Sequence, residues 1–364
     1  MSTTLIKNIK IFNGIECIDK DKVVIENGYI IDKTDGDIEI DGNGCTLIPG
    51  LIDAHIHLYQ IKNLEEASRY GVTTMMDMGT RSPEVVHRLK NLPGLPDIRS
   101  SYSPGFAPGS QVPAKMNYPD SAFVTSADDA ERFVNEQISY GADYIKVIIE
   151  GQGVSVKDTL FPPEILTAIV AKAHIYDKKV IAHVTSSNAF KAAIEGGVDV
   201  VTHIPFAQPL TEEVIQLMKK NGTVSVPTMV TMKGIVESIK KFNPNAPLNY
   251  DYVKEAVARL YKADVTIIAG SDSNTDDPTT PYSAPYGVSL INELGLMVDA
   301  GFTPIQALQS ATSMPAKYFG MNDRGIIKTG YRADLLLIEG DPTVNINDIK
   351  NIKQVWIGGE EIIK

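Results

Sequence analysis

The chain has few of the features that mark secreted, membrane-spanning or nucleic-acid-binding proteins. Its 364 residues include two cysteines, Cys17 and Cys45, which are too few for a disulfide framework. No apolar run approaches the roughly 20 residues of a membrane-spanning helix, and the first residues do not resemble a secretory signal. Bases number 34 against 45 acids, for a net charge of −11, and no basic cluster offers a nucleic-acid or anionic-membrane surface. We therefore expect a cytoplasmic protein whose partner is a small molecule, and leave a homo-oligomer open.

The middle of the chain has the pattern of repeated strand and helix units. Between about residues 50 and 320, short apolar runs alternate with amphipathic stretches, which is typical of a parallel α/β fold. The predicted strands are 51–58, 72–79, 98–103, 143–150, 179–184, 199–204, 223–229 and 265–272. Helices are predicted between most of them, over 126–141, 162–177, 186–197 and 211–222. Eight units favour a (β/α)₈ TIM barrel. An open doubly wound sheet is the alternative, although no G-x-G-x-x-G follows the first strand.

The two ends of the chain carry a different pattern. Asn27-Gly28 and Gly358-Gly359 each separate two β-prone runs, which predicts two hairpins. We expect residues 1–49 and 324–364 to form one small β domain built from both termini, attached to a barrel domain of residues 50–323. Two unrelated terminal hairpins are the alternative.

Four of the six histidines fall near the ends of predicted strands. In "LIDAHIHL", strict alternation places Asp53, His55 and His57 on one face, and such a face is costly to bury without a hydrogen-bond network or a metal ion. His183 and His203 lie near the ends of two later strands. The carboxyl ends of barrel strands meet at one rim, so the four imidazoles indicate a metal site. The other two histidines, His87 and His174, are assigned to helices.

A lysine and an aspartate are predicted at the same rim. Asp272 ends the eighth predicted strand, and Lys146 shares a face with Tyr144 and Ile148. A lysine ammonium has no lone pair for a metal, but its neutral amine could react with carbon dioxide to give a carbamate that bridges two ions. The alternative for Lys146 is a salt bridge to Asp272 or Asp53.

Three carboxylates near this rim could also have roles other than metal binding. Asp272 could cap a helix instead of binding a metal. Asp53 could orient an imidazole. Asp77 could line the pocket or pair with a neighbouring strand, and it is not assigned to the site.

At these positions the sequence resembles the amidohydrolase superfamily, in its binuclear branch near prolidase-like dipeptidases and imidazolonepropionase-related hydrolases. "PGLIDAHIHL" resembles the family's first-strand signature, and "VVIENGYI" and "GIIKTGYRADLLLIEGDP" resemble its β-sandwich domain. The resemblance implies two divalent ions, with zinc as the first choice, and a shared hydroxide that attacks the substrate. It also implies the ligands, which are His55, His57, carboxylated Lys146, His183, His203 and Asp272. Asp272 and the Lys146 carbamate are then the catalytic residues as well.

The resemblance implies a metal-dependent hydrolase that cleaves an amide C–N bond of a dipeptide, an N-acyl amino acid or a cyclic amide. A lactonase or phosphotriesterase would use the same six ligands. A heterocycle deaminase of this superfamily would have an acid shortly after His183, where this chain has "VTSSN". The dipeptidases commonly have a histidine in the loop after the third strand, and "SPGFAPGSQVPAK" has none. A metal-free scaffold protein is the least favoured reading, because all six ligands are present.

Substrate contacts are expected in the long loops of a barrel's carboxyl-terminal mouth. The polar candidates are Tyr102, Gln111, Thr228, Ser273 and Asn274. The cationic candidates for a substrate carboxylate are Arg81, Lys115, Lys157 and Lys233.

Overall fold

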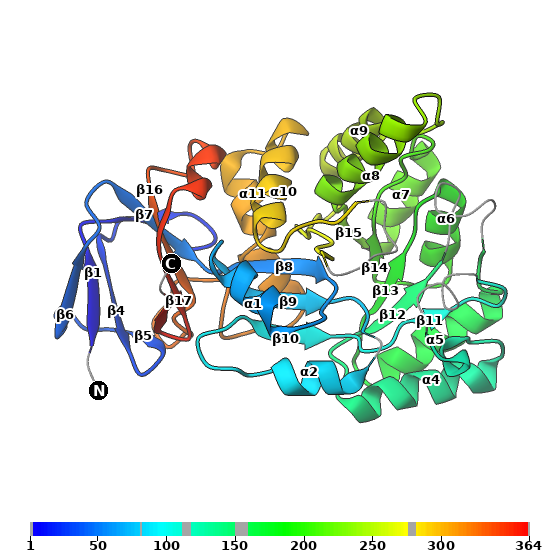
Figure 1. Ribbon diagram of the computed structural model, residues 1–364, viewed down its shortest axis with the longest axis horizontal. Helices are drawn as coiled ribbons and strands as arrows, with labels where there is room; N and C mark the ends of the chain where they lie inside the picture. Colours follow the sequence, from blue (N-terminus) through cyan, green and yellow to red (C-terminus); the bar gives the residue numbers. More distant parts are fainter. Residues whose placement is uncertain (1–2, 81, 111–117, 150–158, 276–281, 363–364) are drawn as a thin grey trace.

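The computed structural model describes residues 3–80, 82–110, 118–149, 159–275 and 282–362. Strands from both ends of the chain lie together at one end of the molecule, and a larger α/β part occupies the rest (Figure 1). Among the described residues, no helix is both long and apolar enough to cross a membrane.

The α/β part is built on parallel strands. Seven of the eight predicted strands are present, and every pairing among these strands is parallel. One sheet has the order β10-β9-β8 and the other β11-β12-β13-β14-β15. The bounds are β8 (Leu51–Ile56), β9 (Val72–Asp77), β10 (Asp97–Ser100), β11 (Gly105–Phe106), β12 (Ile145–Ile148), β13 (Val180–His183), β14 (Val200–Thr202) and β15 (Val224–Val226). The short β11 was not predicted.

The eighth predicted strand is not a regular strand, which corrects the prediction for residues 265–272. The segment makes only isolated bridges, from Ile267 to Ser225 of β15 and from Ser273 to Ile56 of β8. It nevertheless lies between these two strands, because the Ile268 N–H donates to the Ser225 carbonyl (2.9 Å) and the Ala269 carbonyl accepts from β8 (3.1 Å). A left-handed residue, Asp272 (φ 58°), interrupts the extended backbone at its end.

Helices follow the strands where the sequence predicts them. The four predicted helices are present as α4 (Ala127–Tyr140), α5 (Pro163–Ile175), α6 (Ser187–Glu195) and α7 (Glu212–Asn221). Side chains of Ser126, Ser186 and Thr211 accept N–H hydrogen bonds at the first turns of α4, α6 and α7, which satisfies a donor that the helix itself cannot. The remaining helices are α1 (Ile61–Ser68), α2 (Pro83–Leu89), α8 (Met229–Phe242), α9 (Tyr250–Lys262), α10 (Val288–Asp299), α11 (Pro304–Ser310) and α12 (Ser313–Tyr318), with 3₁₀ turns η1 (Asp120–Ala122) and η2 (Ile346–Lys350).

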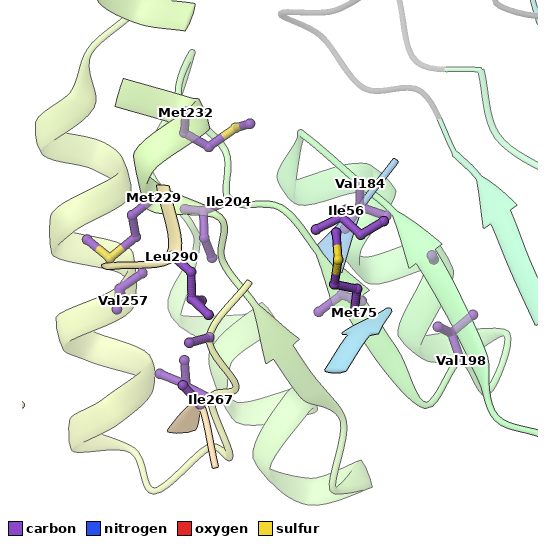
Figure 2. Close-up of a cluster of buried hydrophobic side chains, with 14 of the residues drawn as sticks. Ile56, Met75, Val184, Val198, Ile204, Met229, Met232, Val257, Ile267 and Leu290 are labelled. Carbon is purple, nitrogen blue, oxygen red and sulfur yellow. The ribbon is translucent and has the colours of Figure 1, made fainter. Parts of the chain in front are cut away.

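The parallel strands bury apolar side chains on both faces. On β13, Val180 and Ala182 belong to the large cluster shared with the helices, whereas Ile181 belongs to a second cluster with Val200 and Val224. Figure 2 shows part of the large cluster, where Met229 of α8 and Leu290 of α10 are among the packed side chains. Burial on both faces is typical of parallel strands covered by helices.

The terminal strands form two further sheets. One has the order β5-β4-β1-β6 and the other β18-β17-β16-β7-β2-β3. Their bounds are β1 (Thr4–Lys7), β2 (Lys10–Phe12), β3 (Cys17–Ile18), β4 (Lys22–Glu26), β5 (Tyr29–Ile31), β6 (Ile38–Asp41), β7 (Cys45–Pro49), β16 (Leu335–Glu339), β17 (Ile352–Ile357) and β18 (Glu360–Ile362). Both predicted hairpins are present as the antiparallel pairs β4-β5 and β17-β18.

The two ends of the chain share one of these sheets, because β7 pairs with β16. A buried apolar cluster, which includes Ile6, Leu335 and Trp356, contains residues of both terminal sheets. The alternative of two unrelated hairpins is therefore wrong. β7 continues into β8 with only Gly50 between them, so the terminal strands lead directly to the first strand of the α/β part.

Candidate metal centre

A β-bulge on β8 turns His55 and His57 toward the site. The pairing of β8 with β9 shifts between Asp53 and Ile56, so that β8 has one extra residue there. Ile52 and Ala54 pack in the second cluster, whereas Ile56 packs in the large cluster with the helices. Strict alternation therefore fails, and the prediction that Asp53 shares a face with the two histidines is wrong.

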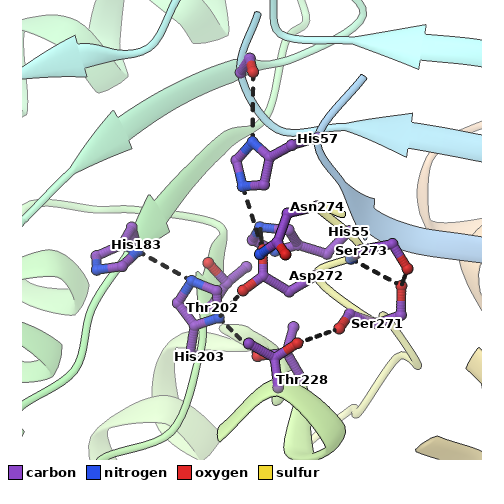
Figure 3. A network of polar contacts seen from close by, with 12 residues as sticks. His55, His57, His183, Thr202, His203, Thr228, Ser271, Asp272, Ser273 and Asn274 are labelled. Carbon is purple, nitrogen blue, oxygen red and sulfur yellow. Dashed lines mark hydrogen bonds and ion pairs between the residues drawn. The ribbon is translucent and has the colours of Figure 1, made fainter. Parts of the chain in front are cut away.

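His55 and His57 converge on Asp272 (Figure 3). The Nε2 atoms of His55 and His57 lie 3.4 and 3.2 Å from Asp272 Oδ1. Ligand atoms of these three residues all lie within 4.8 Å of one another, which is the compactness that a shared ion requires. The backbone fixes the arrangement, because the Asp272 N–H donates to the His55 carbonyl (2.7 Å).

His183 and His203 form the second half of the site. His203 Nε2 lies 3.0 Å from His183 Nδ1, and His203 Nδ1 lies 2.6 Å from the Thr228 hydroxyl oxygen and 3.9 Å from Asp272 Oδ2. Asp272 thus contacts imidazoles of both halves, which joins the four histidines in one site (Figure 3).

Lys146 is buried on β12, on the face away from the helices. Its neighbours Ile145 and Val147 pack in the large cluster, while Tyr144 packs in the second one, as the alternation predicts. The Nζ atom donates to the Thr202 hydroxyl (3.1 Å), and in the described part of the chain it forms no ion pair with Asp272 or Asp53, so that alternative is wrong. Burial lowers the pKa of Lys146 to about 7, which makes the neutral amine readily available near neutral pH.

Burial holds three of the four imidazoles, those of His55, His183 and His203, in the neutral form that binds metals. Burial, together with the nearby Lys146, lowers the pKa of His183 to about 3 and holds the pKa of His55 well below its usual range. For His57, contact with the Asp272 carboxylate outweighs burial and raises the pKa.

The donor set fits divalent metal ions. Neither ring nitrogen of His55 has a hydrogen-bond partner among the described residues, and neither does His183 Nε2, although all three atoms are buried. Buried polar atoms without partners are uncommon in native proteins. Neutral imidazoles grouped with a carboxylate suit zinc and similar ions.

Asp53 holds the segment that carries Asp272. Its carboxylate accepts from the Ser271 N–H (2.9 Å) and the Ser271 hydroxyl (2.5 Å). The Ser271 and Ser273 hydroxyl oxygens lie 2.6 Å apart, on either side of Asp272. Asp53 therefore anchors the segment that presents Asp272, and the prediction that it orients an imidazole is replaced by this role.

Asp77 and Tyr286 hold the backbone around His57. Asp77 accepts from the Leu58 N–H (3.0 Å) and from the Ser100 hydroxyl (2.5 Å), which agrees with the pairing alternative for this residue. The Tyr286 hydroxyl donates to the His57 carbonyl (2.5 Å). Sequence reasoning did not assign Tyr286, and its place in a long loop was the only signal for it.

The predicted substrate contacts lie in several places. Thr228 and Asn274 are buried beside the site (Figure 3). Ser273 is buried and hydrogen bonded to Ser271, whereas the buried Tyr102 packs against His87 and Tyr140. Lys233 lines a groove of about 560 Å³ between α8, α10 and η2, outside the histidine cluster. Arg81, Gln111, Lys115 and Lys157 lie outside the described residues.

The two histidines assigned to helices do lie there. His87, on α2, contacts the Tyr140 carbonyl, and His174, on α5, pairs with Asp199 at 2.9 Å. Neither belongs to the histidine cluster.

Comparison with known proteins identifies the family of this chain. A model of the amidohydrolase family matches residues 46–362. The chain belongs to the amidohydrolase family. The resemblance seen in the sequence is thereby confirmed.

The sequence of this amidohydrolase is similar to those of several proteins with different names. Ochratoxinase of Aspergillus niger is 29% identical over 252 residues, which cover 64% of this chain and 49% of ochratoxinase, so the match spans about half of that curated relative. An uncharacterized protein of Mycobacterium tuberculosis is 26% identical, with 82% of this chain and 80% of that protein covered. The dihydroorotase of Endomicrobium trichonymphae is 24% identical, with 92% and 89% covered.

Solved structures share the fold of this amidohydrolase. A Xaa-Pro dipeptidase with bound methionine has a TM-score of 0.84 at 24% identity, with 100% of both chains covered. The structure of A. niger ochratoxinase has a TM-score of 0.79 at 24% identity, with 99% of this chain and 95% of that chain covered. The α/β fold with parallel strands is therefore one that these proteins share.

Proposed function

We propose that the protein is a metal-dependent hydrolase that cleaves an amide C–N bond of a small substrate. The observation that carries this proposal is the convergence of His55, His57 and His203 on Asp272, with His183 in contact with His203, from strands widely separated in the sequence. Family membership supports hydrolysis as the reaction class.

The proposal includes a closed (β/α)₈ barrel of residues 50–323 and a β-sandwich domain of residues 1–49 and 324–364. Ile268 is hydrogen bonded to β15 and Ala269 to β8, which supports closure of the barrel between these two strands. On the other side, the Asp143 N–H donates to the Ser100 carbonyl (2.9 Å), which joins β10 to the start of β12. The apolar cluster common to both terminal sheets supports the sandwich.

Two divalent ions, with zinc as the first choice, would occupy the site. His55 and His57 would hold one ion, together with Asp272, and His183 and His203 would hold the other. A carbamate on Lys146 would contribute to both. The buried, readily neutralised amine supports this modification, because only a neutral amine reacts with carbon dioxide. Such ions would lower the pKa of a shared water toward about 7 and polarise the scissile carbonyl.

Asp272 would handle the protons of the reaction. Its Oδ1 atom faces His55 and His57, and its Oδ2 atom faces His203, so the carboxylate lies at the centre of the cluster. It would accept the proton of the attacking water and deliver it to the leaving nitrogen, which is general acid–base catalysis by one group.

Dipeptides, N-acyl amino acids and cyclic amides are the substrate classes to test first. A dipeptidase among the proteins of the same fold supports the first class. The experiment is a screen of these three classes, beside lactones, aryl phosphotriesters and amino-heterocycles, on protein loaded with zinc in bicarbonate buffer. Turnover of an amide that disappears in Asp272→Asn is the expected result. Ester turnover or deamination alone would contradict the proposal, and so would inactivity on all classes combined with failure to bind any divalent ion.

A further inference from the structure

Helix α8 begins in an unusual way directly beside the candidate metal centre. Its N-cap residue is Thr228, which has a left-handed backbone (φ 48°, ψ 46°) and makes no side-chain hydrogen bond to the first turn. A β-branched residue rarely adopts this conformation, which costs of order 1–3 kcal/mol unless the surroundings hold it. The Thr and Ser caps of α4, α6, α7 and α11 accept from their own helices, whereas those of α2 and α12 do not. Among the caps without this bond, Thr228 is distinguished by its left-handed backbone.

The Thr228 hydroxyl contacts a predicted metal ligand. Its oxygen lies 2.6 Å from His203 Nδ1. When Nδ1 carries the imidazole hydrogen and donates it to this oxygen, Nε2 keeps its lone pair and faces His183. A hydroxyl used for this contact is not available to cap α8.

A carboxylate from another helix caps α8 instead. Glu293, on α10, is completely buried, and its two oxygens accept from the N–H groups of Met229 (2.9 Å) and Val230 (2.7 Å). These are the first two residues of α8, whose N–H groups have no partner within the helix. Burial raises the pKa of Glu293 to about 8, so near neutral pH the cap consists of these two hydrogen bonds and not of a full negative charge.

We propose that Glu293 is a positioning residue for the metal centre: by capping α8 from α10, it leaves the Thr228 hydroxyl on His203 Nδ1 and fixes the imidazole with Nε2 toward His183. The part of this inference that concerns metal affinity rests on the proposed function. The geometry of the imidazole does not, because it depends on hydrogen bonds within the chain.

The test compares Glu293→Gln, Thr228→Val and Thr228→Ser with the wild type. Gln keeps one of the two oxygen acceptors and replaces the other with an NH₂ donor, Val removes the hydroxyl but keeps the shape, and Ser keeps the hydroxyl. Ser126→Ala is the matched control, because it removes a cap from α4, which has 14 residues like α8 and contributes no residue to the site.

The first readout is the tautomer of His203 in metal-free protein, measured from its ¹⁵N imidazole shifts and assigned by loss of the signals in His203→Asn. We expect the Nδ1–H form in the wild type and Thr228→Ser, and a gain of the Nε2–H form in Thr228→Val and Glu293→Gln. Ser126→Ala should lower the melting temperature and leave the tautomer unchanged.

The second readout is the affinity for the more weakly bound zinc ion, measured by competition with a chelator. Loss of an outer partner of a metal-binding histidine weakens binding by about 10- to 100-fold, and we expect this range for Thr228→Val and Glu293→Gln. The inference is overturned if Thr228→Val keeps the wild-type tautomer, or if Glu293→Gln matches Ser126→Ala in both readouts. A wild-type protein that binds no divalent ion refutes the proposed function, and the tautomer measurement then still decides the role of Glu293.

Discussion

The Nδ1 atom of His183 lies 3.0 Å from the Nε2 atom of His203. Burial keeps both rings neutral, and at this short distance only one of the two nitrogens can carry a hydrogen, so at least one keeps its lone pair there. The contact joins proposed ligands from the ends of two adjacent strands, and a simple experiment distinguishes a structural histidine pair from a metal site.

His183→Asn should reduce the bound zinc from two ions per chain to one. The remaining ion would stay with His55, His57 and Asp272, whose ligand atoms already lie close together. Metal content after dialysis, measured by mass spectrometry, gives the result. His174→Asn is the matched control, since that half-exposed histidine pairs with Asp199 on the surface. Two tightly held ions in His183→Asn would show that this histidine is not a ligand.

The stability of the metal-free protein should rise with pH because of Lys146. Burial lowers the pKa of this lysine from 10.5 to about 7. Between these values the unfolded chain binds one more proton than the folded chain, so the free energy of unfolding increases with pH, by up to about 1.4 kcal/mol per unit. Below pH 7 both states are protonated and this contribution is constant.

Urea unfolding at pH 7, 8 and 9, with chelator and without carbon dioxide, measures this effect. The difference between the wild type and Lys146→Met isolates the lysine, because all other groups are common to both proteins. We expect the free energy of unfolding of the wild type to increase relative to that of Lys146→Met as the pH rises. Parallel curves for the two proteins would mean that the folded chain does not depress the pKa of Lys146.

Arg324→Met should destabilise the protein without changing its metal content. Arg324 is buried between β9, β10 and the C-terminal region, where its guanidinium donates to Asp97 (2.7 Å) and to the Thr74 hydroxyl (3.1 Å). Removing it leaves the buried Asp97 with only the longer ion pair to Arg99 (3.7 Å), at a cost of up to about 3–5 kcal/mol.

Denaturant unfolding of Arg324→Met and of the exposed control Arg132→Met tests this cost. Arg132 pairs with Asp129 and Glu136 on the surface of α4, where such pairs contribute about 0–1 kcal/mol. Equal losses in the two variants would show that the Arg324 ion pair adds nothing beyond a surface pair.

The strands and the positions of the four clustered histidines could be predicted because both depend on local patterns. Short apolar runs ended by polar residues identified seven parallel strands, and His55, His57, His183 and His203 stand near the ends of three of them. The eighth strand was predicted from the same pattern, but Asp272 adopts a left-handed conformation that no propensity reveals.

Side-chain directions were harder to predict than strands. One extra residue in β8 reverses the alternation between Ala54 and His55, so Asp53 faces Ser271 and not the imidazoles. A bulge of this kind depends on the partner strand, and one chain segment alone does not specify it.

Long-range partners could not be inferred at all. Glu293 is 64 residues from Met229 in the sequence, and Tyr286 is 229 residues from His57. Neither lies in a motif, and their roles follow only from packing. The sequence thus indicates which groups are candidate metal ligands, but not which groups hold them in place.

The single residue between β7 and β8 has a consequence for how the protein can be divided. Gly50 donates to Asp334 and lies so close to Thr73 that a Cβ atom would come within 2.3 Å of its hydroxyl oxygen. The terminal sheets are thus joined without a linker to β8, the strand that carries His55. An engineer who replaces those sheets must therefore reproduce this junction, because any twist introduced there would be transmitted along five residues to the first imidazole.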